Sequence, residues 1–414
     1  MRVLIVAPGS RGDVAPFTGL GQALLAAGHE VTIAGYAMFS DLVTGSGLAF
    51  SPLPGDPRLL EAAAWGRRGS GPLGVTRLIR LTAEHLRDLH TGILDAARQA
   101  DVLALSGISY AGGYHIALAL GMPSFGLALA PVYPTRDFPP STLTARDLGR
   151  FGNLAAGQIL TFFGAPVLAG PVQQLRAELG LPKISSRQAI IGHMDATGWP
   201  ALHGFSPSVV PRPADWRRGL EVTGYWWPYS RASWTPPPEL ADFLAAGPPP
   251  VFAGLGSMAP ANAAQLSDVI AAAARRAGAR VVIQAGRAGL TSPMAAGSAM
   301  LIGEVPHDWL FPRMAALIHH AGAGTTGAGF RSGVPAIAVP MIGDQPFWGA
   351  RIAALGARPH PIPLRRLSTA KLAAAIRDAT TRASYRDRAR ELAARIARED
   401  GTRPVIETLA SLPG

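Results

Sequence analysis

Apolar and polar positions follow two different periods along the first forty residues. Residues 3–7 form an unbroken apolar run, which is typical of a strand buried on both faces. Four apolar side chains then recur at helical spacing, and Gly28 ends the pattern: Phe17, Leu20, Leu24 and Ala27. Residues 30–35 form the next apolar run. The pattern predicts a strand, a loop over 8–13, a helix and a second strand, which together make a βαβ unit.

The same order of elements returns further along the chain. Short apolar runs lie at 101–107, 123–131, 249–257, 279–286, 316–322 and 335–341, and helix-like stretches separate them. Alternation of strands and helices predicts an α/β protein with doubly wound parallel sheets. The second half begins like the first, with a strand that runs into Gly-Ser.

A stretch rich in proline and tryptophan separates the two halves and holds two triple-proline runs, at 236–238 and 248–250. Such sequence cannot continue a helix and suits an interdomain connection. We therefore expect an N-terminal domain at 1–215, a connection at 216–235 and a C-terminal domain at 236–395. Residues 396–414 are expected to form a helix that packs back on the first domain. The ligand cleft should lie between the carboxyl ends of the two sets of strands.

Composition narrows the class of protein. The chain of 414 residues is 48% hydrophobic and 16% charged, which is enough apolar material for sizeable cores. Its formal charge of +11 comes almost entirely from arginine, since Lys183 and Lys371 are the only lysines. The arginines are scattered and mostly neighbour acidic residues, and no compact basic run contains aromatic residues. No nucleic-acid partner is expected.

The chain contains no cysteine, so disulfides and thiolate metal sites are excluded. The apolar run at the N-terminus is too short for a signal peptide. The longest apolar stretch, 114–132, is interrupted by His115, Gly121 and Pro123, whereas a membrane span needs about 20 apolar residues. We expect a cytoplasmic protein without stable membrane insertion, either a monomer or a homodimer.

The segment HHAGAGTTGAG, residues 319–329, carries the strongest candidate chemistry. A strand ending at His319, a turn over 320–324 and a helix capped by Thr325 and ended by Gly333 would direct free backbone N–H groups at one point. His320 could then donate to a phosphate oxygen, while His319 is expected to pack in the core. A diphosphate is the natural occupant, and the predicted contacts are His320, Gly322, Ala323, Gly324 and Thr325. The alternative is a tight turn with packed histidines.

A competing motif overlaps this segment. Gly322, Gly324 and Gly327 spell G-x-G-x-x-G, and Asp344 lies about 20 residues beyond, as in enzymes that bind NAD(P). The acid, however, comes after Pro340, in a predicted loop, and the motif gives the histidine pair no role. A nicotinamide-dependent oxidoreductase is therefore the second hypothesis.

Four segments, 9–35, 209–227, 303–340 and 343–356, resemble the GT-B nucleotide-sugar glycosyltransferases. The resemblance is to the branch of sterol glucosyltransferases and bacterial antibiotic glycosyltransferases of glycopeptides and polyketides. It implies two Rossmann-like domains that face each other across a cleft, with the acceptor on the first and the donor on the second. It also implies inverting transfer from a UDP- or dTDP-sugar without a metal or other cofactor. A nucleotide-sugar epimerase or binding protein of the same fold remains a third hypothesis. Ala321 replaces the first of the two glycines that usually follow the histidines in the family, and it is expected to crowd the phosphate slightly.

The resemblance assigns roles to individual residues. Asp13 is the expected general base, although a helix N-cap would also explain it. Asp344 and Gln345 are expected to bind the donor sugar, with helix capping by Asp344 as the alternative. Gly256 and Ser257 match a second phosphate loop or an ordinary turn. Val305 and His307 are expected to hold the nucleobase through their backbone, and Trp309 is expected in the core.

The acceptor side is the least defined by sequence. Residues 62–78 are predicted to form a loop over the N-terminal cleft. Ser10, Tyr133 and Phe138 are expected to contact the acceptor, an apolar small molecule.

Overall fold

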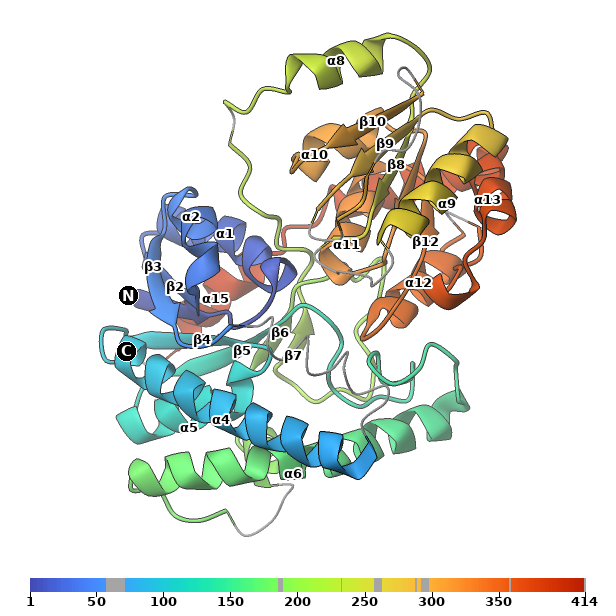
Figure 1. Cartoon of the computed structure of the whole chain (residues 1–414). Helices are drawn as coiled ribbons and strands as arrows, with labels where there is room; N and C mark the ends of the chain where they lie inside the picture. The colour runs from blue at the N-terminus through green and yellow to red at the C-terminus, as the bar shows by residue number, and fades with distance from the viewer. Residues whose placement is uncertain are drawn as a thin grey trace.

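The computed structural model describes residues 1–56, 71–184, 189–231, 233–256, 263–286, 289–291, 298–356 and 359–412. It contains two α/β domains, one at the lower left of Figure 1 and one at the upper right. All strand pairs in both sheets are parallel. This confirms the predicted pair of doubly wound parallel sheets. None of the described helices is long and apolar enough to cross a bilayer.

The first sheet has the strand order β3-β2-β1-β4-β5-β6-β7. Its strands are β1 (Arg2–Val6), β2 (Glu30–Tyr36), β3 (Ala49–Leu53), β4 (Val102–Ser106), β5 (Ser124–Ala128), β6 (Ala201–His203) and β7 (Leu220–Val222). The helices of this domain are α1 (Arg11–Ala26), α2 (Ser40–Thr44), α4 (Gly71–Ala97), α5 (Ser109–Leu120), α6 (Gly149–Glu178) and α7 (Ala189–Ala196). Because α4 begins at Gly71, residues 71–78 are helical and not the predicted loop, while residues 62–70 lie outside the described residues.

The second sheet has the order β10-β9-β8-β11-β12. Its strands are β8 (Val251–Gly254), β9 (Val281–Gln284), β10 (Ala299–Ile302), β11 (Ala316–His319) and β12 (Ala336–Ala338). The remaining helices are α8 (Pro238–Ala245), α9 (Ala263–Arg276), α10 (His307–Leu310), α11 (Ala323–Ser332), α12 (Gln345–Ala354), α13 (Thr369–Thr381), α14 (Ala383–Ile396) and α15 (Arg403–Ser411).

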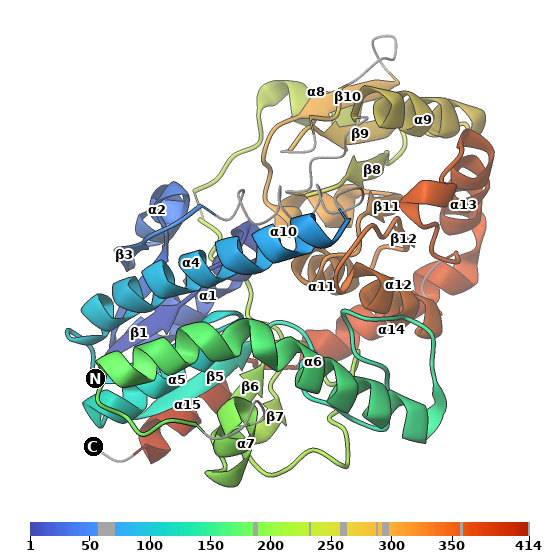
Figure 2. The same ribbon diagram turned by 60° about the horizontal axis from the view of Figure 1, so that its bottom comes forward.

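Alternate side chains of each strand enter different cores, as the two-residue period of a strand requires. Val3 and Ile5 of β1 pack with α1 on one face of the first sheet, whereas Leu4 and Val6 pack toward α4 on the other. Figure 2 shows α4 and α6 lying side by side along that second face. Because these strands are buried on both faces of the sheet, their sequences are continuous apolar runs.

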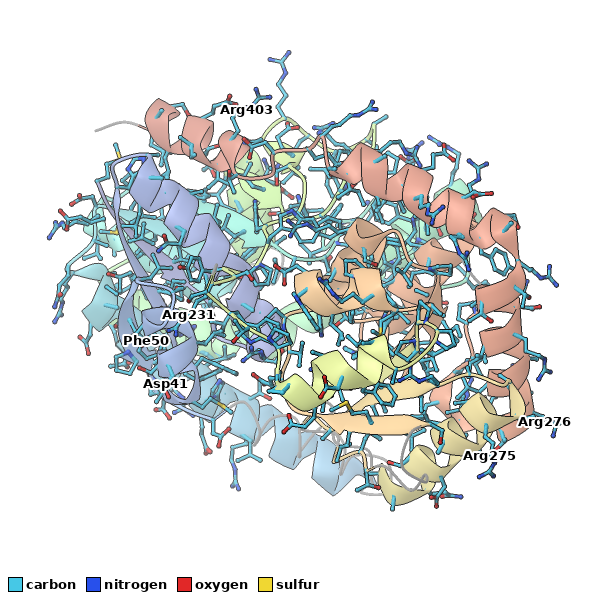
Figure 3. The ribbon with its side chains drawn as sticks, turned by 90° about the horizontal axis from the view of Figure 1, so that it is seen from above. Asp41, Phe50, Arg231, Arg275, Arg276 and Arg403 are labelled. Carbon is cyan, nitrogen blue, oxygen red and sulfur yellow. The ribbon has the colours of Figure 1, made fainter. Side chains whose placement is uncertain are left out.

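The connection between the domains, which includes Trp226, Tyr229 and Arg231 and which we call the strap, packs against other parts of the chain. The Trp226 indole is buried and donates to the Gly401 carbonyl at 2.8 Å. Tyr229 N–H donates to the Thr18 hydroxyl at 2.9 Å, and the Arg231 guanidinium donates to the Gly45 carbonyl. Figure 3 shows Arg231 beside Asp41 and Phe50 of the first domain. Since β7 belongs to the first sheet, that domain extends to residue 222, past the predicted boundary at 215.

The chain returns to the first domain at its end. Val405 and Leu409 of α15 are fully buried in the same core cluster as Val3 and Phe17. Figure 3 shows Arg403, at the start of α15, on the side of the molecule that carries the blue helices. The strap and the segment that leads to α15 therefore both connect the two domains.

Candidate active site

Asp13 lies in the first turn of α1, directly after β1. The helix begins at Arg11 with Ser10 as its N-cap, so the predicted loop over 8–13 ends earlier and Asp13 is the third helical residue, not the N-cap. Ser10 donates twice to Asp13 Oδ2, from its backbone N–H at 2.7 Å and from its hydroxyl at 2.9 Å. Ser10, which we predicted on the acceptor side, thus holds the carboxylate, and both bonds use the same oxygen.

Protein on both sides of the cleft changes the acidity of Asp13. Its side chain keeps contact with solvent, yet the surrounding protein removes enough water that desolvation raises its pKa. The hydrogen bonds from Ser10 act in the opposite direction and are the smaller effect. Asp13 in turn contributes to a raised pKa at Asp344, after the larger effect of burial there. The two predicted site carboxylates therefore lie near each other across the cleft.

Sequence reasoning missed Tyr36, whose pKa responds to the charge of Asp13, and its hydrogen-bond partner His85. The Tyr36 hydroxyl is 2.8 Å from His85 Nε2, and the Tyr36 ring is buried at the end of β2. Burial, then Asp13 and Asp56, raise the pKa of Tyr36 to about 12. The apolar run of β2 ends at Tyr36, at the same sheet edge as Asp13, and this position was the available signal.

The turn after β11 forms the opposite wall. Helix α11 begins at Ala323, with Gly322 as its N-cap and no capping side chain. The predicted cap at Thr325 is therefore wrong, because Thr325 is the third residue of the helix. With no capping side chain, the first N–H groups of the helix are left without helical or side-chain partners among the described residues. Gly333, in the left-handed conformation at φ 67°, ends the helix as predicted.

His320 sits at the entrance to this helix between two glycines. A Cβ on Gly256 would lie 2.6 Å from its Cε1, and a Cβ on Gly322 would overlap its Nε2. Its Nδ1 is buried with no hydrogen-bond partner among the described residues. Burial lowers the pKa of His320 to about 4, so the ring is neutral at pH 7. The described residues thus place Gly256 at the predicted phosphate site, while Ser257 lies outside them.

Neighbouring residues in the same segment pack in the core. His319 is fully buried and accepts from Ala321 N–H at 3.1 Å, in accord with its predicted packing role. Ala321 adopts φ 62°, a left-handed conformation that costs a non-glycine residue about 1–2 kcal/mol. Its methyl group is buried in the hydrophobic core, so the prediction that Ala321 crowds the phosphate is wrong.

The predicted nucleobase loop follows β10. Val305 is buried, and the His307 ring stacks on Phe311 with centroids 4.2 Å apart. Burial, then the positive charge of Arg11, lower the pKa of His307 to about 4. Arg11 also forms a 3.2 Å ion pair with Glu304, which joins the Asp13 turn to this loop across the cleft. Trp309 is half-buried against Trp234, at a centroid distance of 5.1 Å.

The two predicted donor-sugar residues open α12. Asp344 is the N-cap residue but makes no side-chain capping bond, since its Oδ2 accepts from Trp348 Nε1 at 2.7 Å. Gln345 is buried, and its amide oxygen accepts from the backbone of Met341 at 2.8 Å and Ile342 at 3.2 Å. The remaining Asp344 oxygen and the Gln345 NH₂ group are the polar atoms available to a ligand.

The predicted acceptor aromatics are engaged elsewhere. Tyr133 packs edge-on to His203 and Trp216, and Phe138 packs edge-on to Phe347 of α12. Both line a crevice of only about 100 Å³ between 131–142 and α6. That volume is below the 300–1,000 Å³ typical of small-molecule sites. The contact of these rings with the acceptor therefore stays a prediction.

Two features bear on the alternative hypotheses. Asp344 lies beyond the end of β12 at Ala338 and not at a strand tip, where a dinucleotide-binding acid belongs. Among the described residues, no group of three or more histidine and acidic side chains is arranged to hold a metal ion.

Comparison with known proteins agrees with this geometry. Residues 3–125 match the glycosyltransferase family 28 N-terminal domain, and residues 268–412 match the erythromycin biosynthesis protein CIII-like C-terminal domain. The chain is 34% identical over 425 residues to the O-mycaminosyltylonolide 6-deoxyallosyltransferase of Streptomyces fradiae, covering 97% of this chain and 95% of the relative. It is 33% identical over 392 residues to a sterol 3-beta-glucosyltransferase of Arabidopsis thaliana, covering 91% of this chain and 60% of the relative.

Solved structures share the whole fold at lower identity. The glycosyltransferase of kitacinnamycin superposes with a TM-score of 0.73 at 17% identity, covering 99% of this chain and 98% of the other. The glycosyltransferase VinC in complex with dTDP gives 0.69 at 20% identity, covering 99% of each chain. The chain spans 33% of the length of the sterol 3-beta-glucosyltransferase of Eremothecium gossypii, to which it is 33% identical. The chain belongs to the GT-B nucleotide-sugar glycosyltransferases, in the branch that holds sterol glucosyltransferases and bacterial antibiotic glycosyltransferases.

Proposed function

We propose that this glycosyltransferase moves a sugar from a UDP- or dTDP-sugar to a hydroxyl group of an apolar small molecule, with inversion and with Asp13 as the general base. One observation carries the proposal. Two helix N-termini face the cleft, and α1 presents a carboxylate whereas α11 presents free N–H groups and His320. Figure 1 shows α1 and α11 opposite each other between the domains, and the two helices are in contact.

The groups suit a single displacement. The free Asp13 oxygen would take the proton of the acceptor hydroxyl as that oxygen forms a bond to the anomeric carbon. The bond from the anomeric carbon to the diphosphate would break at the same time, and its electron pair would go to the diphosphate oxygen. The N–H groups of Ala323, Gly324 and Thr325 and the ring of His320 would stabilise that charge. Attack opposite the leaving group inverts the configuration.

The raised pKa of Asp13 favours this role. A carboxylate with an ordinary pKa is a weak base, whereas desolvation raises the pKa of Asp13 and makes it a stronger base. Because the positive end of α11 and a hydrogen bond from His320 would stabilise the diphosphate, we propose that transfer needs no metal ion. A chelator should then leave turnover unchanged.

The relatives support the substrate classes. Their names specify a sterol and O-mycaminosyltylonolide as acceptors, and glucosyl and 6-deoxyallosyl groups as the sugars transferred. Both acceptors are largely apolar molecules with hydroxyl groups.

A donor and acceptor screen tests the proposal. Purified protein would be incubated with UDP-glucose or a dTDP-deoxysugar and a panel of hydroxylated steroids and macrolides, with product mass and anomeric configuration as readouts. We expect a mass gain of one sugar and the inverted anomer. A retained anomer would overturn the displacement, and binding of neither UDP nor dTDP in calorimetry would overturn the donor assignment.

A further inference from the structure

The carboxylate of Asp344 is held by a tryptophan one turn further along α12. Trp348 Nε1 donates to Asp344 Oδ2 at 2.7 Å, and the backbone N–H of Trp348 donates to the Asp344 carbonyl at 3.1 Å. The side chain of Trp348 is fully buried, so its indole orientation is fixed by packing. The indole therefore selects one orientation of the carboxylate and leaves Oδ1 for another partner.

Trp348 itself is fixed by the other domain. Its ring packs edge-on to Phe205 of the N-terminal domain, with centroids 5.8 Å apart, and to its neighbour Phe347 at 5.3 Å. Phe347 packs on Phe138, also of the first domain, at 5.5 Å. One turn further along, Arg351 Nε donates to the Val209 carbonyl at 3.1 Å. This face of α12 thus packs on the first domain. Because that packing fixes the indole of Trp348, it also fixes the hydrogen bond from the indole to Asp344.

We propose that Trp348 is a positioning residue, which orients the Asp344 carboxylate toward the hydroxyl groups of the donor sugar. This inference rests on the proposed function, in which Asp344 binds that sugar. A carboxylate free to rotate would lose orientational order on binding, whereas one preset by a buried donor does not.

The bond also influences the charge of Asp344. Burial raises the pKa of Asp344, the Trp348 hydrogen bond lowers it, and Asp13 raises it again. Loss of the indole donor would therefore favour the protonated acid as well as releasing the side chain. Both changes would weaken the hydrogen bonds of Asp344 to the sugar hydroxyls. The contacts of the nucleotide with α11 would not change.

The test compares Trp348→Phe with Trp226→Phe, a matched control. Trp226 is also buried and would also lose one indole hydrogen bond, of 2.8 Å to the Gly401 carbonyl, but it lies in the strap and packs on Phe17 of α1, on the acceptor side. Calorimetry would measure the Kd of UDP and UDP-glucose, and of dTDP and dTDP-glucose, for the intact chain at pH 7. Melting temperature would report folding for every variant.

We expect Trp348→Phe to lower the affinity for the nucleotide sugar by about tenfold and to leave the affinity for the nucleoside diphosphate unchanged. A tenfold loss is the size expected for a charge-assisted hydrogen bond. Trp226→Phe should change neither affinity. It should lower the melting temperature about as much as Trp348→Phe does, because each variant loses one buried indole hydrogen bond. An unchanged ratio of the two affinities in a folded Trp348→Phe protein would overturn the inference.

A third variant, Asp344→Asn, separates this inference from the proposed function. If Asp344→Asn lowers the nucleotide-sugar affinity but Trp348→Phe does not, only the positioning role fails. If Asp344→Asn also leaves the ratio unchanged, the assignment of Asp344 to the donor sugar fails, and the role of Trp348 fails with it. If Trp348→Phe does not fold, Phe205→Leu offers a milder release of the same indole and should lower the same ratio less.

Discussion

The turn after β1 and the turn after β11 share a backbone plan and differ in chemistry. Each is a buried parallel strand, a short glycine-containing loop and a helix whose N-terminus points at the cleft. In α1 the third helical residue is Asp13, and its carboxylate already occupies the helix entrance. In α11 the corresponding residue is Thr325, the N-cap is Gly322, and no side chain caps the entrance.

This difference decides which ligand each turn can take. The positive end of a helix attracts negative charge. When the protein supplies that charge, the turn repels an anion and presents a base. When the entrance is left open, the turn binds an anion. In the proposed function, a single residue position, the third of the helix, would separate the acceptor-side base from the donor-side phosphate site.

The largest expected effect comes from removing the base. Asp13→Asn keeps the volume and can still accept from Ser10 N–H, but it cannot take a proton. Turnover with an aliphatic alcohol should fall by roughly 10²–10⁴-fold, with donor affinity unchanged. The melting temperature should fall only slightly, because Asn can still accept from Ser10 N–H and loses only the charge at the helix N-terminus, worth about 0.3–1 kcal/mol. Asp13→Ala should lose both turnover and stability, and near-normal turnover of Asp13→Asn would refute the assignment.

The second prediction converts one turn into the other. Thr325→Asp places a carboxylate at the α11 position that corresponds to Asp13. Nucleoside diphosphate affinity should fall by roughly 100-fold through charge repulsion, whereas the ligand-free protein should gain about 0.3–1 kcal/mol of stability from a negative charge at the helix N-terminus. Calorimetry and thermal melts would test both, with Thr325→Asn as the neutral control. Unimpaired diphosphate binding by Thr325→Asp would show that α11 does not receive the phosphates.

The third prediction concerns the histidine at the open entrance. His320→Ala removes a hydrogen-bond donor to a charged group, which is worth about 1.5–3 kcal/mol. The affinity for UDP or dTDP should fall accordingly, and the affinity for uridine or thymidine should not. Equal weakening of nucleotide and nucleoside in calorimetry would show that His320 does not contact phosphate.

Acid should affect the two turns in opposite directions. The pKa of Asp13 is raised and that of His320 is lowered to about 4. As the pH falls, protonation of Asp13 should reduce turnover at a higher pH than protonation of an ordinary aspartate would. Protonation of His320 is favoured by a bound anion, so the ratio of wild-type to His320→Ala affinity for the diphosphate should rise. This ratio also corrects for protonation of the ligand itself, and a falling ratio would contradict the prediction.

Folding stability has its own acid dependence. His307 and His320 have folded pKa values of about 4, below the usual 6.5. Between those two values the unfolded chain binds protons that the folded chain does not. The stability that these neutral rings contribute is therefore fully present above pH 6.5 and is lost as the pH falls toward 4. Thermal melts across this range provide the check.

The smallest effect is expected at Ala321. Glycine there relieves a left-handed conformation at φ 62°, but it also removes a buried methyl group and frees the unfolded chain. These terms oppose each other, so Ala321→Gly should change stability by less than about 1 kcal/mol and should leave diphosphate affinity unchanged. A clear gain in affinity would restore the idea that the methyl group crowds the phosphate.

The sequence predicted most of the sheets but missed several edge and short strands. β3 and β10 are edge strands with exposed positions, and β3 contains Pro52. β6 and β7 have three residues each. A short or half-exposed strand carries too few apolar residues to show a period, and only pairing with a neighbour defines it.

By itself the sequence determined the parallel α/β plan, the family and the residue types at the two cleft turns. Those features are local, since periodic burial and glycine, histidine and aspartate spacing depend on a few neighbouring positions. Only the tertiary structure decided where each helix begins, and hence that Asp13 and Thr325 occupy the same helical position. It alone showed that two glycines clamp His320, that the Ala321 methyl group is buried and that Trp348 links Asp344 to Phe205. These contacts join segments far apart along the chain or depend on side-chain directions that the backbone fold imposes, and no local pattern encodes either.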